Sequence, residues 1–256
     1  MGDMRTDTIQ TLLNINKEFY QSFGQAFAET RRRIQPGIAR ALEEYIRDGD
    51  WLDLGCGSGA LSQAWVKRGL MGSYTGVDFS RALLEEASRG LSQEQLPGGL
   101  QIAFRQADLL DENWCAPFYD RQFDGLLAFA VLHHIPGKVN RERLVRQAAG
   151  LLRPGGLFIH SQWQFQHSPK LMARVQPWSL AGIDEADLEP GDTLLDWRHQ
   201  AGGNAGATGL RYVHLFSREE LVHLADQGGF EIVSEYSSDG AGEKLGLYQV
   251  WRKPAS

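Results

Sequence analysis

The segment that decides the fold reads Asp53-Leu-Gly-Cys-Gly-Ser-Gly59. Residues 51–54 read as a strand and residues 58–68 as a helix, so the glycines lie in the connection between them. Glycines in such a connection let the backbone turn tightly and let a ligand approach it closely. The segment therefore indicates an α/β domain that binds a ligand at this loop.

Strands and helices alternate on both sides of this loop. The expected helices cover 9–29, 36–47, 58–68, 80–89 and 140–152, and the expected strands cover 51–54, 73–78, 100–105, 123–130 and 157–163. Such alternation implies a parallel sheet with right-handed crossovers. Towards the end of the chain we expect a strand at 211–216, a helix opened by the capping box Ser217-x-x-Glu220, and an antiparallel hairpin of strands 230–236 and 245–251.

These elements predict one Rossmann-like α/β domain over residues 1–256, with a seven-stranded, mostly parallel sheet and helices on both faces. We expect an N-terminal helical cap over 1–48, a core over 49–163, an insertion over 164–210 and C-terminal strands and a helix over 211–256. The insertion holds an acidic stretch, 184–192, and a glycine-rich stretch, 201–209. Long irregular insertions are usually lids or mobile loops, so this one is expected to order when a ligand binds.

Two cofactors are compatible with the glycine loop. Gly55 to Ala60 satisfies the G-x-G-x-x-A pattern of dinucleotide-binding proteins, so NAD has to be weighed. The anionic Asp53 before the first glycine would repel a pyrophosphate, and the chain has no Tyr-x-x-x-Lys pair of the short-chain dehydrogenase kind. The loop and its carboxylate instead favour S-adenosyl-L-methionine, whose amine and sulfonium are both positive.

Acidic residues follow the next two expected strands as well. Asp78 is placed to accept hydrogen bonds from both ribose hydroxyls, and Asp108 is placed to reach the adenine amino group. A single aspartate after a strand is ordinarily a turn residue or a helix cap. With Asp53, however, three acids follow successive strands, and the carboxyl ends of parallel strands share one crevice. We therefore interpret them as one cofactor site.

Residues 50–160 resemble the class I S-adenosylmethionine-dependent methyltransferases, including the segment Leu151-Leu-Arg-Pro-Gly-Gly156 before the fifth strand. The resemblance implies S-adenosyl-L-methionine as cofactor and S-adenosyl-L-homocysteine as product. It also implies the following cofactor contacts: Asp53, Gly55, Cys56, Gly57, Asp78, Phe79, Ser80, Ala107, Asp108, Leu109, Phe129 and Ala130.

A narrower resemblance extends over nearly the whole chain. Four segments resemble those of the tRNA wobble-uridine carboxymethyl methyltransferases: Phe123 to Pro136, Phe27-x-x-Thr-Arg31 with Pro36, Asp192-Thr-Leu-Leu-Asp-Trp197, and Arg211-Tyr-Val-His-Leu-Phe216. Those enzymes esterify the carboxylate of 5-carboxymethyluridine, and some tRNA-directed relatives work with a small zinc-binding activator subunit. This chain differs from them at Gln35, where they usually have Trp, and at 242–246, where they commonly have Asn-Trp.

This resemblance implies four catalytic candidates: His133, Asp192, Arg211 and His214. Methyl transfer from a sulfonium is an in-line displacement, so the protein mainly aligns the two reactants. A carboxylate acceptor is already ionised at neutral pH and needs no general base. Arg211 can then hold it through a bidentate pair, and His133 or His214 can donate a further hydrogen bond. For a phenol or amine acceptor, His133 is the candidate base.

Composition excludes several classes of protein. The 256 residues carry 26 Lys and Arg against 32 Asp and Glu, a net charge of -6, and two cysteines, Cys56 and Cys115. Two cysteines are too few for a disulfide scaffold or a Cys₄ zinc site. The start lacks the pattern of a signal peptide, and no apolar run reaches ~18 residues. We expect a cytoplasmic protein with no bound metal, no membrane contact and no DNA partner.

The sequence leaves two candidates for the methyl acceptor, tRNA and a small carboxylic acid. The net charge of -6 and the acidic stretch 184–192 suit a small-molecule O- or N-methyltransferase better than an enzyme acting on a polyanion. A non-catalytic scaffold is the third alternative, and the complete set of acids and acceptor-side residues argues against it. Binding of tRNA would show a steep dependence on salt, whereas turnover of a small molecule would not.

Overall fold

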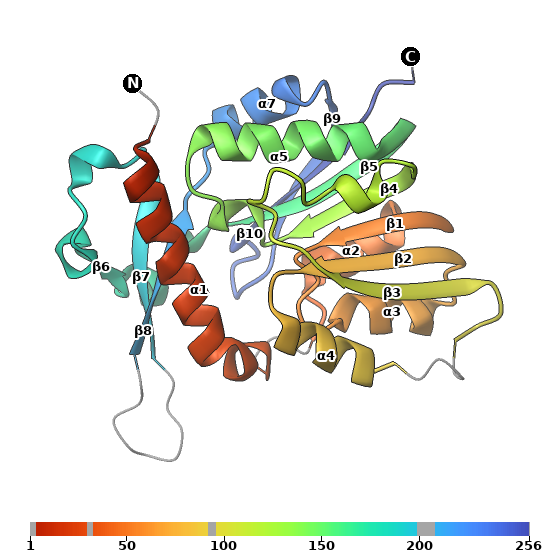
Figure 1. Cartoon of the computed structure of the whole chain (residues 1–256), viewed down its shortest axis with the longest axis horizontal. Coiled ribbons are helices and arrows are strands. Elements are labelled where there is room, and N and C mark those ends of the chain that lie inside the picture. Colours follow the sequence, from red (N-terminus) through yellow and green to blue (C-terminus); the bar gives the residue numbers. More distant parts are fainter. Residues whose placement is uncertain (1–3, 30–32, 92–95, 199–207, 256) are drawn as a thin grey trace.

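The computed structural model describes residues 4–29, 33–91, 96–198 and 208–255. Thr30 and Arg31, and residues 201–207 of the glycine-rich stretch, lie outside the described residues. The main sheet has seven strands in the order β3-β2-β1-β4-β5-β10-β9 (Figure 1). Its strands are β1 Gly49–Leu54, β2 Gly72–Asp78, β3 Leu100–Gln106, β4 Phe123–Phe129, β5 Leu152–Trp163, β9 Glu231–Ser238 and β10 Gly246–Arg252.

The first five strands pair in parallel, and β10 runs antiparallel to both β5 and β9. The predicted seven-stranded, mostly parallel sheet and its closing hairpin are therefore confirmed. Because β1 to β5 are parallel, their carboxyl ends meet at one edge, which is where ligands of open α/β sheets bind.

Helices cover both faces of this sheet, as Figure 1 shows with α5 and α7 on one face and α2, α3 and α4 on the other. They are α2 Pro36–Glu44, α3 Ala60–Arg68, α4 Arg81–Arg89, α5 Lys138–Leu151 and α7 Arg218–Gln227. Trp65 of α3 packs on Trp51 of one face, and Phe158 and Trp251 fill the core of the other. Within the described parts of the chain, no helix has both the length and the apolar character needed to cross a membrane.

The chain forms a second sheet that the sequence did not predict. Its strands, β6 Val175–Gln176, β7 Asp192–Arg198 and β8 Thr208–His214, are antiparallel. The expected strand at 211–216 thus belongs to this sheet and not to the main one. The expectation of an irregular insertion is wrong for residues 164–198, which also contain α6 Pro169–Met172. Their apolar residues are widely spaced in sequence and gather only when the strands pair.

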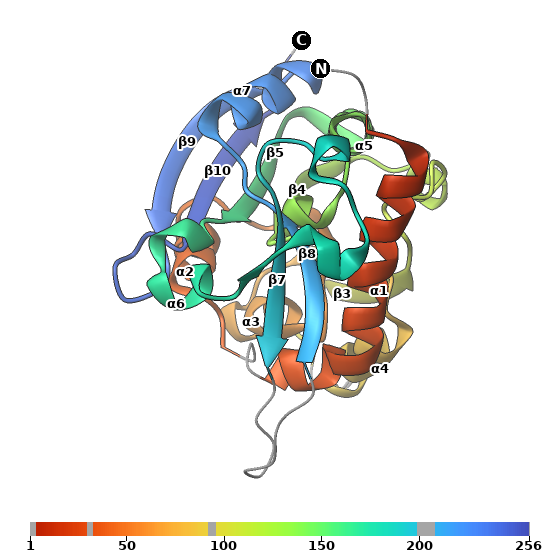
Figure 2. The same cartoon turned by 90° about the vertical axis from the view of Figure 1, so that its left-hand side faces the viewer.

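The first helix, α1 Thr6–Glu29, joins the two sheets. It lies beside β8 in both views of the molecule (Figures 1 and 2). Leu12 of α1 is fully buried in a small core with Trp178, Leu194 and Tyr212. The ring of Tyr20, two turns further along α1, meets the ring of Phe79 edge-on at 5.8 Å. The helix therefore forms a wall between the second sheet and the carboxyl ends of the main sheet.

Candidate active site

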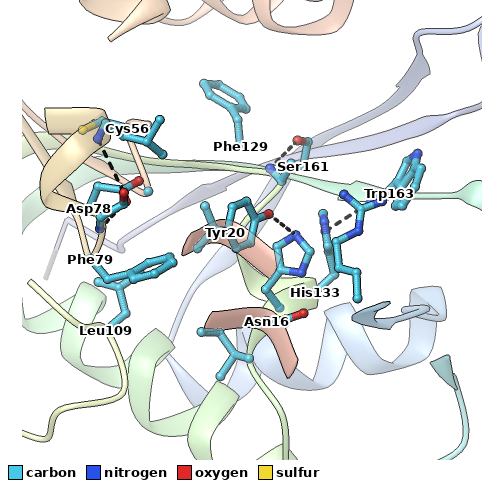
Figure 3. A pocket seen from close by; sticks show the side chains of 18 of the residues that line it. Asn16, Tyr20, Cys56, Asp78, Phe79, Leu109, Phe129, His133, Ser161 and Trp163 are labelled. Atoms are coloured by element: carbon cyan, nitrogen blue, oxygen red, sulfur yellow. Dashed lines mark hydrogen bonds between the residues drawn. The ribbon is translucent and has the colours of Figure 1, made fainter. Parts of the chain in front are cut away.

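A cavity of about 1420 Å³ lies between the carboxyl ends of β1 to β5, α1 and β8. Pockets for one small ligand commonly measure about 300–1000 Å³, so this cavity has room for a cofactor and a second reactant. Figure 3 shows Cys56, Asp78 and Phe79 on one side and His133 and Trp163 on the other, with Tyr20 between them.

The glycine loop after β1 forms one end of the cavity. Gly55 has φ +70°, and a Cβ there would lie 2.6 Å from Cγ2 of Val131. Gly59 has φ +79°, and a Cβ there would lie 2.8 Å from Cβ of Ala87. Glycine is therefore required at both positions, because it alone combines a left-handed backbone with this close packing. The resulting tight turn brings Gly55 and Cys56 to the surface of the cavity.

Asp78 is fixed at the end of β2 by two backbone donors. The N–H of Gly57 donates to Oδ2 at 3.0 Å, and the N–H of Ser80 donates to Oδ1 at 2.8 Å. Burial raises the pKa of Asp78, although these backbone hydrogen bonds oppose the rise. Asp78 and Ser80 line the cavity, whereas Gly57 does not and contributes by positioning Asp78.

Asp53 does not line the cavity. The carboxylate is buried beneath the glycine loop and accepts a hydrogen bond from the hydroxyl of Tyr74 on β2. Burial raises the pKa of Asp53 to about 7, although the Tyr74 hydroxyl opposes the rise. The structure therefore does not bring the Asp53 side chain to the cavity with Asp78 and Asp108, because it points towards the neighbouring strand.

The end of β3 supplies a second acid to the cavity. The Asp108 side chain forms a turn with its own backbone, since the N–H of Leu110 donates to Oδ1 at 3.0 Å. Ala107, Asp108 and Leu109 all line the cavity, and Phe79, 38% exposed, lines the same side. The geometry thus brings the predicted residues of β2 and β3 together.

The end of β4 carries a strained residue. Ala130 has φ +58°, and its N–H donates to the carbonyl of Ser161 at 3.2 Å and to Oγ of Ser161 at 3.1 Å. A left-handed conformation costs a residue with a Cβ roughly 1–3 kcal/mol and tends to occur at functional sites. Phe129, Ala130 and Ser161 all line the cavity.

Arg211 and His133 lie at the opposite end. Arg211 is 4% exposed, and its guanidinium carbon lies 4.8 Å from the ring centre of Trp163 and 5.3 Å from that of Phe19. His133 is 1% exposed, and its Nδ1 lies 3.4 Å from both Oε1 of Gln162 and the backbone nitrogen of Trp163. Both residues line the cavity, so two of the four predicted catalytic candidates lie there.

A chain of hydrogen bonds connects α1 to β8 at this end. Nδ1 of His134 lies 3.2 Å from the carbonyl oxygen of Tyr212, which can only accept, so Nδ1 carries a proton. The hydroxyl of Tyr20 lies 3.1 Å from Nε2 of the same ring. Tyr20 lines the cavity, as does Asn16 one helical turn before it. Sequence reasoning missed both, although polar residues four apart share a helix face.

Asp192 and His214 are not brought to the cavity. Oδ1 of Asp192 accepts the hydroxyl of Tyr212 at 2.8 Å and lies 2.8 Å from Nδ1 of His214. Nε2 of His214 lies 3.0 Å from Oε1 of Glu220 on α7. Burial lowers the pKa of His214, but the two carboxylates raise it further, so it lies above the ordinary value. The pair braces β8 against α7 and lies apart from the other two catalytic candidates, His133 and Arg211.

Glu189 extends this buried network. Its Oε2 lies 2.6 Å from Nη2 of Arg141, a residue 3% exposed. Glu189, Asp192 and His214 present three ligand atoms within 4.8 Å of one another. Arg141 and His214 already compensate the charge of the two acids, so the cluster is accounted for as an ion-pair network.

Comparison with known proteins identifies the family. The sequence profile of the family described as "Methyltransferase domain" matches residues 26–235. The chain belongs to this family. It is an S-adenosylmethionine-dependent methyltransferase, as the sequence predicted, and S-adenosyl-L-methionine is its cofactor. The acids at the ends of β2 and β3 and the glycine cradle after β1 fit that cofactor, since it carries ribose hydroxyls, an adenine amino group and two positive charges.

Two relatives are similar in sequence. The methyltransferase is 28% identical over 237 residues to a methyltransferase-designated protein of Encephalitozoon cuniculi, covering 92% of this chain and 93% of that one. It is 24% identical over 166 residues to the human protein named "Probable tRNA methyltransferase 9B", covering 63% of this chain. The match spans only 32% of the human protein.

Two solved structures share the fold. The glycopeptide N-methyltransferase MtfA complexed with S-adenosyl-L-homocysteine has a TM-score of 0.62 and 16% identity, covering 86% of this methyltransferase and 87% of that chain. A methyltransferase complexed with the Trm112 activator of Haloferax volcanii has a TM-score of 0.61 and 15% identity, covering 94% and 97%. These likenesses establish the fold.

Proposed function

We propose that this methyltransferase esterifies a carboxylate of its acceptor, and that the acceptor is the wobble 5-carboxymethyluridine of tRNA. The observation that carries the proposal is the buried guanidinium of Arg211 at the end of the cavity opposite the glycine loop. A guanidinium presents its donors as a planar fork that matches the two oxygens of a carboxylate. Stacking against Trp163 holds that fork in one plane.

The charges along the cavity support an anionic acceptor. Asp78 and Asp108 lie at the end that suits a cationic cofactor, whereas Arg211 and the exposed Lys17 of α1 line the wall formed by α1 and β8. The ring of Trp163 borders the same end, and the ring of Tyr20 lies between that end and the cofactor side. Aromatic side chains are the usual stacking partners of an unpaired base, so this end suits a planar base that carries a carboxylate.

Methyl transfer to a carboxylate requires little from the protein except alignment of the two reactants. The cofactor supplies a methyl group on a positively charged sulfur. A carboxylate acceptor is already ionised at neutral pH, so none of the residues has to remove a proton. Arg211 orients the acceptor, and His133 beside it is a second donor. Asp78 would accept hydrogen bonds from the ribose hydroxyls with its remaining lone pairs and so would orient the cofactor for transfer.

One human relative supports the acceptor class, and one structural neighbour supports a partner. The human relative bears a tRNA methyltransferase name, and one structural neighbour was solved with the Trm112 activator. We propose that this chain likewise works with a small activator subunit. A net charge of -6 leaves little basic surface for tRNA, and such a subunit would supply it.

The test uses methyl-labelled cofactor, bulk tRNA and a small-metabolite fraction, with and without an activator subunit. We expect label in tRNA that mild alkali releases as methanol, because methyl esters hydrolyse in base whereas N-methyl and ether groups do not. Label confined to small metabolites would favour the small-molecule alternative, which the net charge also suits. Alkali-stable label would contradict a carboxylate acceptor.

A further inference from the structure

We infer that Asn16 of α1 is a specificity-determining residue that donates a hydrogen bond from Nδ2 to the acceptor carboxylate, beside Arg211. This inference rests on the proposed function and names a second group that recognises the same anion. Asn16 is 7% exposed and lines the cavity close to Tyr20 and His133 (Figure 3).

The amide of Asn16 is held in one orientation. The backbone N–H of Tyr212 donates to its Oδ1 at 2.9 Å. Only the oxygen of an amide can accept from an N–H, so Nδ2 occupies the other branch of the side chain. Arg211 directly precedes Tyr212 on β8, and its side chain lines the same cavity. The bond thus fixes the Asn16 amide next to the strand that carries the guanidinium.

The donor of this amide has no acceptor among the residues that the structure describes. Nδ2 of Asn16 is buried and makes no hydrogen bond to any of them. Buried polar groups are nearly always paired, and leaving a donor unpaired is costly, so each exception calls for an explanation. A bound acceptor that offers an oxygen at this point would satisfy the donor.

The neighbouring groups specify the kind of acceptor. Guanidinium and amide N–H₂ groups are donors without lone pairs to offer, so a ligand can meet them only with acceptor atoms such as oxygens. A carboxylate offers two oxygens and a negative charge. The corresponding carboxamide would place its own N–H₂ against one of the donors, leaving polar groups unpaired on both sides. Sites built in this way reject the mismatched analogue strongly, so we expect selection of the acid over the amide.

A purely structural role is the rival explanation, because the Tyr212 bond already ties α1 to β8. The variant Asn16→Asp separates the two. It keeps an oxygen for the N–H of Tyr212 and nearly the same shape, but it replaces the donor with a negatively charged oxygen. Ser22→Asp is the control for an added negative charge on the same helix, since Ser22 is exposed and does not line the cavity.

Binding is measured by calorimetry on protein saturated with S-adenosyl-L-homocysteine. The probes are the nucleoside 5-carboxymethyluridine and its neutral amide, 5-carbamoylmethyluridine. We expect Asn16→Asp to bind the acid at least 30-fold more weakly than the parent and to bind the amide more tightly than the parent, because the N–H₂ of the amide then meets an acceptor. Ser22→Asp should stay within threefold for both probes, because solvent screens its charge. Affinity for S-adenosyl-L-homocysteine should be unchanged in both variants.

Asn16→Asp binding the acid as tightly as the parent would overturn the inference and leave Asn16 as a tie between α1 and β8. A parent that does not prefer the acid to the amide would overturn the anionic acceptor itself, and the inference with it. A second measurement needs no variant: the side-chain ¹⁵N–¹H₂ signals of Asn16 in the parent should shift with the acid and stay in place with the amide. Signals that respond equally to both probes would contradict the inference.

Discussion

One buried histidine should make the protein less stable in mild acid than a variant that lacks this histidine. His160 lies on β5, is fully buried, and packs edge-on against Trp251 with ring centres 4.2 Å apart. Its Nδ1 lies 3.0 Å from Nε2 of Gln162, which donates to it. Burial lowers the pKa of His160 to about 3, well below the ordinary 6.5. The folded protein therefore keeps this ring neutral where the unfolded chain protonates it.

The sign and size of the effect follow from proton linkage. Below pH 6.5 the unfolded state binds one proton more than the folded state, so the free energy of unfolding decreases as the pH falls. Each pH unit costs about 1.4 kcal/mol for one proton. Between pH 7.5 and pH 5.0 His160 should therefore remove about 2 kcal/mol, and the loss should continue towards pH 3.

Urea unfolding at pH 7.5 and pH 5.0 measures this loss in the parent and in His160→Gln. Glutamine does not titrate and retains a polar group for Gln162. Other groups act at the same time: the raised pKa values of Asp53, Asp78 and His214 add stability as the pH falls, and the lowered pKa of Glu220 removes it. All of these groups are common to the two proteins, so the difference between the two pH-dependent changes isolates His160. An equal loss in parent and variant would refute the reasoning.

Three further outcomes are expected at the site and beside it. Arg211→Lys should lower kcat/KM by one to two decades, at about 1.4 kcal/mol per decade. The affinity for S-adenosyl-L-homocysteine should stay unchanged. A lower melting temperature with unchanged specific activity would show that Arg211 is structural. The pKa of Asp53 is about 7, so the affinity for the positively charged cofactor should rise between pH 6 and pH 8 as this carboxyl ionises. In calorimetric titrations, Asp53→Asn should abolish that rise. A rise that persists in the variant would point to another group. Asp192→Asn should lower the free energy of unfolding by about 3 kcal/mol, because it weakens a buried pair with His214. The KM for the acceptor should stay unchanged. A raised KM in the folded variant would return Asp192 to the catalytic candidates.

The cofactor half of the site was predictable because its signals are local. Strand, loop and helix follow one another within a few residues, so the glycine loop, Asp78 and Asp108 could be placed at one edge from periodicity and the rules of parallel sheets. Asp53 shows the limit of that reasoning. Its position next to the loop was evident, but its hydrogen bond to Tyr74 depends on the register between β1 and β2.

The acceptor half was only partly predictable because its contacts are remote in sequence. The R-Y-x-H string pointed to Arg211, which lines the cavity, but alternation along β8 sends Tyr212 and His214 to a different side of that strand from Arg211. Asn16 could not be singled out, because its role depends on a partner 196 residues away. The second sheet was missed for the same reason, since no short window of sequence contains its core.

The packing of α1 against β8 also determines when each half of the enzyme can form. The parallel strands β1 to β4 pair with neighbours within residues 49–129, so the cofactor half depends on contacts of moderate sequence separation. Helix α1 precedes every strand in the sequence, but it can dock on β8 only after residues 208–214 have left the ribosome. Contacts of such high sequence separation form late and slowly. A nascent chain therefore gains the strands that hold its cofactor well before it can select a substrate.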